Sequence, residues 1–182
     1  MTAQRLFTLC LMPYVGWLLF DYRYHFLDGA NLLFHEAGHL VFGLLGEWPH
    51  FLGGSLGQLV FPAFTAGYFF RRGQRFEAAV CGIWFGESLF YLAVYMADAR
   101  DQRLPLVGGH IHDWNWMLSR LGLLDACHAL AGTVRALASA WLLACLVGAW
   151  RWSVPPRPVL TADEALAEKR RRRWAKAIKP RQ

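Results

Sequence analysis

Five apolar segments alternate with short polar segments along the chain. They cover residues 6–20, 30–46, 55–70, 76–97 and a last stretch within 126–150. The first three segments are close to the lower limit of the roughly 17 to 25 residues that a helix needs to cross a bilayer. The pattern therefore predicts an all-α fold, a polytopic transmembrane helical bundle of about five spans.

Local signals predict where the second and third helices begin. Asp28 is expected to cap the helix over 30–46, because an aspartate side chain accepts hydrogen bonds from the first backbone N–H groups of a helix. The polar run 47–50 is expected to separate the two helices. Gly53 and Gly54 are then expected to open the third helix.

The composition agrees with a membrane protein. Of the 182 residues, 55% are hydrophobic and only 18% are charged, whereas a soluble domain of this length would show a more charged surface. The net charge of +6 arises largely at the C-terminus, because all three lysines and the arginine run 170–173 lie in the last fourteen residues. The chain is therefore expected to consist of a membrane domain, 1–154, and a basic tail, 155–182. Such a tail beside transmembrane helices favours contact with anionic lipid over binding to nucleic acid.

The distribution of basic residues predicts an orientation in the membrane. Cytoplasmic loops are enriched in Lys and Arg, so the loop 71–75 and the tail are both expected in the cytoplasm of a multi-pass protein, with a bacterial inner membrane as its setting. Five spans then leave the N-terminus outside and put the segment 108–116 on the face opposite the start of the second helix. Either that segment re-enters the bilayer or one apolar segment does not cross fully.

The second apolar segment contains the sequence His35-Glu36-Ala37-Gly38-His39. Two histidines four residues apart lie on one face of a helix and can share a zinc ion, and the glutamate beside them is a natural general base for water activated at the metal. The alternative is a chance pattern with two hydrogen-bonded core histidines. Because ionisable residues are costly in an apolar helix, the setting favours a functional zinc site.

A catalytic zinc site needs a third protein ligand and one open position. Asp113 is preferred, because a carboxylate from a separate segment would complete a set of two histidines and one carboxylate. The alternatives are His112, His110, Asp98 and Glu87. Glu87 is a lone carboxylate in the fourth apolar segment and is equally compatible with a buried polar helix contact.

These features together resemble the site-2 protease family of membrane-embedded zinc metalloproteases. The resemblance covers about residues 28–120: the histidine motif on an apolar helix, then an apolar segment with a Gly-Gly pair, Gln58 and Pro62, then a segment that bears an aspartate. The chain would be a small, divergent member, because the family usually places its aspartate before a glycine and Asp113 is followed by Trp114.

The resemblance implies a role for each matching residue. His35, His39 and Asp113 would be the zinc ligands and Glu36 the catalytic base, so residues 1–154 would form a transmembrane metalloprotease-like domain. The expected function is hydrolysis of peptide bonds in membrane proteins or peptides. Two alternatives stay open, namely a zinc-dependent membrane hydrolase of another amide or ester bond, and a non-catalytic metal-binding or assembly protein.

Overall fold

All regular secondary structure is helical within the residues that the computed structural model describes, which are 1–107, 111–154, 166–167, 169–170 and 174. The α-helices are α1 (Ala3–Phe20), α2 (Phe26–Gly43), α3 (Glu47–Arg71), α4 (Arg75–Ala97), α5 (Asp113–Arg120) and α6 (Cys127–Trp152), and a short 3₁₀ helix, η1 (Leu124–Ala126), precedes α6. The predicted all-α class is confirmed. The basic tail predicted over 155–182 lies almost wholly outside the described residues.

Three of the helical segments are long and apolar enough to cross a membrane. They are Ala3–Phe20, Arg75–Ala97 and Leu124–Trp152, which correspond to α1, α4 and α6 with η1. Three of the five predicted spans therefore meet both requirements, which is consistent with a membrane protein. The described part of the segment 108–116 includes the start of α5, whose eight residues are far fewer than the roughly 20 needed to cross.

The predicted starts of α2 and α3 were wrong. The N-cap of α2 is His25, and Asp28 is the third residue of the helix, where its carboxylate accepts a hydrogen bond from the His25 backbone N–H at 2.8 Å. The run from Glu47 to His50 does not separate the helices but forms the first turn of α3, a place where a proline is tolerated because its N–H would be unpaired anyway. The break is at Gly46, whose φ of 117° favours glycine.

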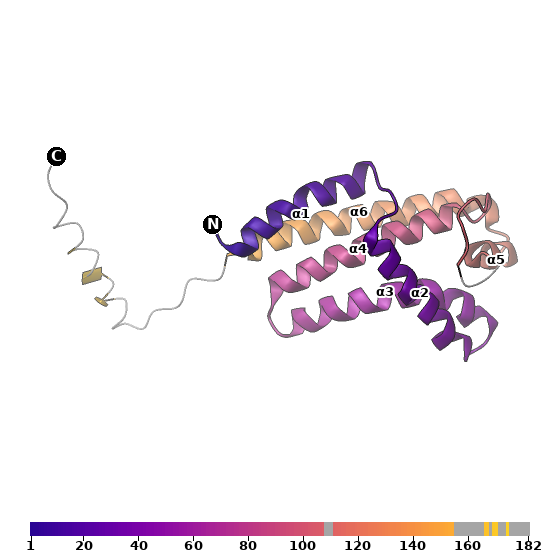
Figure 1. Cartoon of the computed structure of the whole chain (residues 1–182), viewed down its shortest axis with the longest axis horizontal. Coiled ribbons are helices and arrows are strands. Elements are labelled where there is room, and N and C mark those ends of the chain that lie inside the picture. The colour runs from indigo at the N-terminus through magenta and orange to yellow at the C-terminus, as the bar shows by residue number, and fades with distance from the viewer. Residues whose placement is uncertain (108–110, 155–165, 168, 171–173, 175–182) are drawn as a thin grey trace.

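Helix α4 lies in the middle of the bundle (Figure 1). It packs against α6 on one side and α3 on the other, while α1 lies on α6 and α2 on α3. The contact between α1, α4 and α6 is apolar, with a core of six buried residues: Val15, Leu18, Ile83, Phe90, Ala138 and Leu142. Apolar packing therefore holds these three helices together.

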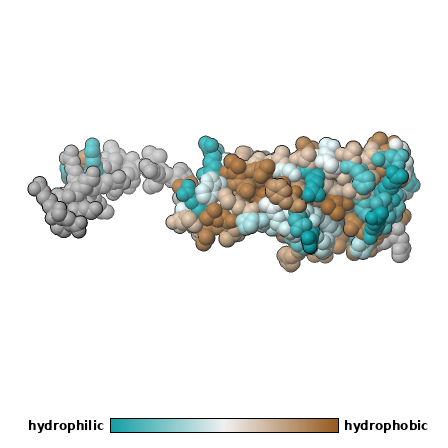
Figure 2. Space-filling model, turned by 90° about the horizontal axis from the view of Figure 1, so that it is seen from above, coloured by the Kyte–Doolittle hydropathy of each residue, from teal (hydrophilic) through white to brown (hydrophobic). Residues whose placement is uncertain are grey.

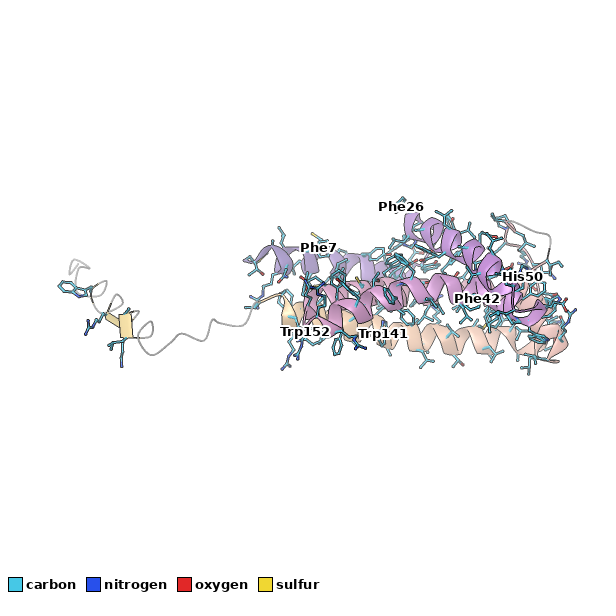
Figure 3. The ribbon with its side chains drawn as sticks, turned by 90° about the horizontal axis from the view of Figure 1, so that it is seen from below. Phe7, Phe26, Phe42, His50, Trp141 and Trp152 are labelled. Atoms are coloured by element: carbon cyan, nitrogen blue, oxygen red, sulfur yellow. The ribbon has the colours of Figure 1, made fainter. Side chains whose placement is uncertain are left out.

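The contact between α2 and α3 is made by glycines. A Cβ atom on Gly38 would overlap the Gly53 carbonyl, and a Cβ on Gly53 would lie 2.6 Å from the Phe42 Cβ. Small residues at such a crossing let two backbones approach closely, a common arrangement between membrane helices. Phe42 of α2 and His50 of α3 lie near the same end of the pair (Figure 3).

Polar and apolar residues are separated along the length of the bundle. On the face shown in Figure 2, hydrophobic residues gather along the middle, and hydrophilic residues are densest at the end that carries α5. This separation is the one expected of a bundle with its middle in lipid and its end in water or at the interface.

Candidate metal centre

Helix α2 presents a polar face to the rest of the protein. Its buried residues are Asp28, Asn31, His35 and Gly38, none of which has an apolar side chain. On its outer face Leu33 and Leu40 are 73% and 78% exposed. A helix of a soluble protein buries its apolar face, whereas α2 buries polar residues and exposes leucines.

Three donor atoms meet at the end of this polar face. His35 Nε2 lies 2.9 Å and His39 Nε2 3.2 Å from the same oxygen of Asp113, Oδ2. His35 and Asp113 are buried, and one ligand atom from each of the three residues lies within 4.8 Å of the others, so the group could hold a metal ion. Asp113 reaches the site because it begins α5, which packs against α3.

Each histidine has a second polar partner at its other ring nitrogen. His35 Nδ1 lies 3.2 Å from the Gln58 Oε1, and His39 Nδ1 lies 2.8 Å from the His50 backbone oxygen. Both partners are acceptors, so each Nδ1 must carry the hydrogen that it donates. In a neutral imidazole with its hydrogen on Nδ1, the Nε2 atom is an acceptor. This is the tautomer that binds a metal through Nε2.

Three acceptors therefore face one another at 2.9 to 3.2 Å, which is unfavourable unless positive charge lies between them. Protons on the imidazoles or one metal cation would supply that charge. Burial raises the pKa of the Asp113 carboxyl, but when the imidazoles carry protons on Nε2, their hydrogen bonds and charge outweigh burial and lower this pKa below its ordinary value. The carboxyl is therefore an anion at neutral pH, the form that binds a metal.

The backbone of α3 leaves room for the group. A Cβ atom on Gly54 would lie 2.5 Å from His35 Nε2 and 2.6 Å from His39 Nε2. Any residue larger than glycine would thus place a methyl group against both nitrogens. Gly54 lies inside α3 and not at its start, and its role is to let the imidazoles lie against the helix backbone.

Glu36 lies beside the donor group in the wall of a cavity of about 760 Å³. Its side chain is half-buried, and the donor residues His35, His39 and Asp113 line the same cavity. Most of the remaining wall is apolar or aromatic and includes Leu32, Leu40, Tyr91, Val94, Leu106 and Val107. A carboxylate, three convergent donors and an apolar chamber are thus next to one another.

His112, Asp98 and Glu87, which were also considered as a third ligand, lie elsewhere. His112 caps α5 by accepting from the Asn115 backbone N–H, and its Nε2 lies 3.6 Å from Asp98 Oδ2. Burial lowers the pKa of His112, although Asp98 and Asp113 oppose this. Glu87 belongs to a separate polar cluster with His25 and Asp28, and His110 lies outside the described residues.

Two residues around the site had no role in the sequence analysis. Tyr95 OH accepts from the Asp113 backbone N–H at 3.2 Å and lies 3.4 Å from Asp113 Oδ2, and His50 supplies the carbonyl that His39 contacts. No sequence signal marks them, because a tyrosine in an apolar helix and a backbone oxygen are both ordinary. Gln58 was singled out only as part of a family resemblance, and its contact with His35 gives it a physical role.

The chain matches no protein-family model, no curated protein and no solved structure.

Proposed function

We propose that the protein is an intramembrane zinc metalloprotease that hydrolyses peptide bonds of membrane proteins. The proposal rests on one observation: His35 Nε2, His39 Nε2 and Asp113 Oδ2 converge as acceptors at 2.9 to 3.2 Å beside Glu36. Two imidazoles, one carboxylate and an open position are a common catalytic zinc set, and the H-E-x-x-H spacing supports zinc over other divalent metals. The arrangement is also the one that the site-2 protease resemblance implies.

The proposed setting is a bacterial inner membrane, with α2 and α3 added to the three spans already described to make five. The surface of α2 supports this. Lipid would cover its exposed leucines, and its polar residues would face the protein interior, away from lipid. Loop 71–75 and the basic tail would lie in the cytoplasm. The segment that bears Asp113 would re-enter toward the site from the other face, where protein and not lipid surrounds it.

The chain's own residues divide the chemistry between them. When bound, zinc would polarise the substrate carbonyl and make water acidic enough to lose a proton near neutral pH. Glu36 would accept that proton and then deliver it to the leaving amine, so that one carboxylate serves as base and then as acid. His35, His39 and Asp113 hold the site, and Gln58 and the His50 carbonyl fix the two imidazoles in the binding tautomer.

The cavity supports a peptide as the substrate. Its volume of about 760 Å³ is in the usual range of ligand-binding pockets. Its largely apolar walls suit the apolar side chains of a membrane peptide. A transmembrane helix has its amides shielded by hydrogen bonds, so a substrate would have to unwind locally before a peptide bond reached Glu36.

The test is zinc content together with proteolysis of a model transmembrane substrate by the purified protein in lipid. We expect zinc to be retained in Glu36→Gln while cleavage falls at least roughly a hundredfold, because a general base contributes that much or more. Glu47→Gln is the matched control, since Glu47 lies outside the cavity wall and its side chain is 66% exposed. Undiminished cleavage by Glu36→Gln would refute the proposed mechanism. Zinc without proteolysis in the wild type would favour another hydrolase or a non-catalytic metal protein.

A further inference from the structure

A second group of ionisable side chains is buried away from the proposed catalytic site. His25 ends the connection from α1 to α2, Asp28 lies in the first turn of α2, and Glu87 lies in the middle of α4. One ligand atom from each residue lies within 4.8 Å of the others. The connection from α1 to α2 passes beside α4 (Figure 1), which brings the three elements together.

The hydrogen bonds of the cluster leave one atom without a partner. Glu87 Oε2 accepts from Asn31 Nδ2 at 2.8 Å, whereas Glu87 Oε1 has no hydrogen-bond partner among the described residues. His25 Nε2 lies 3.9 Å from Oε1. That distance is too long for a hydrogen bond and leaves room for an atom bound to both.

The remaining contacts set up His25 as a ligand. Its Nδ1 lies 2.7 Å from Asp28 Oδ2, so this nitrogen carries the hydrogen and Nε2 presents its lone pair. Nε2 accepts from the Tyr14 hydroxyl at 2.8 Å, and a cation bound between Nε2 and Glu87 would replace that hydrogen bond. A histidine held by a carboxylate at one nitrogen and open to a cation at the other is a frequent arrangement around bound metals.

The charge of the cluster also calls for a cation. Asp28 and Glu87 are both completely buried, and no lysine or arginine pairs with either of them in the described part of the chain. One imidazole is therefore the only basic side chain beside two carboxyl groups. Buried carboxylates without a counter-charge are very costly, so the cluster must take up either a proton or a metal ion.

The alternative to a metal ion is a proton. Glu87 Oε2 already accepts from Asn31, so a proton would reside on Oε1 and be shared with the neighbouring Asp28. It would neutralise only one of the two carboxyl groups. A divalent cation between Oε1, His25 Nε2 and an Asp28 oxygen would give the unpaired oxygen a partner and balance the charge. An imidazole with two carboxylates suits a transition-metal cation better than Mg²⁺ or Ca²⁺, which prefer oxygen ligands alone.

We propose that His25, Asp28 and Glu87 form a second metal site, distinct from the proposed catalytic one, that takes a divalent transition-metal cation such as Zn²⁺. Asp28 and His35 lie seven residues apart on α2, so the two sites are about 10 Å apart along the helix. His25 is only 18% exposed and the two carboxyl groups are completely buried, so the site is closed. Its role is structural: it ties the α1–α2 connection, whose Tyr22 and Tyr24 line the cavity, to α2 and α4.

The test is the zinc content of the full-length protein after removal of metal with a chelator and reloading with Zn²⁺ alone. We expect two zinc ions per chain in the wild type, one in His35→Ala, one in Glu87→Gln and none in the double variant. Glu77→Gln is the matched control and should keep both ions, since Glu77 lies on the same helix outside the cluster and accepts a hydrogen bond from Gln4 at 3.4 Å.

His35→Ala decides the question, because it leaves the second cluster untouched even if Glu87→Gln fails to fold. A His35→Ala protein without zinc would overturn the proposal and indicate that the two carboxyl groups share a proton instead. So would one zinc ion that persists in the double variant. If the catalytic proposal alone is wrong, the wild type would hold one ion that survives His35→Ala and is lost in Glu87→Gln.

Discussion

Replacement of Gly54 by alanine is expected to destroy the catalytic metal site while leaving the helix intact. The added methyl carbon would lie 2.5 Å from His35 Nε2 and 2.6 Å from His39 Nε2, whereas ordinary contacts begin at 3.4 Å. Each nitrogen would have to retreat by about 0.8 to 0.9 Å. Metal–ligand distances tolerate only about 0.2 Å, so the two imidazoles cannot both bind after such a shift.

The expected loss in zinc affinity is roughly a hundredfold or more, because even changes outside the ligand set cost 10-fold to 100-fold. A hundredfold loss corresponds to about 2.8 kcal/mol. The fold itself should not suffer from the change in helix propensity, since alanine is favoured over glycine within a helix by about 1 kcal/mol. Loss of metal with retained helicity is therefore the predicted signature.

Zinc titration against a chelator of known affinity measures this effect, with circular dichroism as the check on folding. Gly67→Ala is the control, because Gly67 lies on the same helix α3 and a Cβ there meets nothing within 4 Å. The control should bind zinc as the wild type does. Normal zinc affinity in Gly54→Ala would show that the imidazoles do not bind metal in the positions described.

Three further substitutions test the surroundings of the site. Asp113→Ala should lose zinc about as severely as His39→Ala, whereas Asp98→Asn should change zinc content little; equal retention by both aspartate variants would remove Asp113 from the ligand set. Gln58→Leu should weaken zinc binding about 10-fold to 100-fold by removing an imidazole partner, and Gln58→Glu should restore most of it in the same titration, a rescue that a purely steric role would not produce. Tyr95→Phe removes the hydroxyl that contacts Asp113, so it should lower zinc affinity by roughly tenfold; an unchanged affinity would mean that this contact does not position the carboxylate.

The sequence alone determined the features that depend on neighbours along the chain. Two histidines four residues apart must share a helix face once that helix forms, and Glu36 must lie beside them. The apolar segments likewise predicted helices, because a long apolar segment that lies in lipid must satisfy its backbone hydrogen bonds within itself. The starts of α2 and α3 were missed, since a histidine cap and a proline in the first turn are weak signals.

Only the tertiary structure decided which distant residues meet. Asp113 is 78 positions from His35, and nothing in the local sequence distinguishes it from Asp98 or His112 as a partner. The approach of α2 to the glycines of α3, and the return of the chain through α5, put its carboxylate against both imidazoles. His25, Asp28 and Glu87 come together in the same way. Helix geometry sets distances over a few residues, but distances between helices depend on how their faces pack, and a single sequence does not reveal that packing.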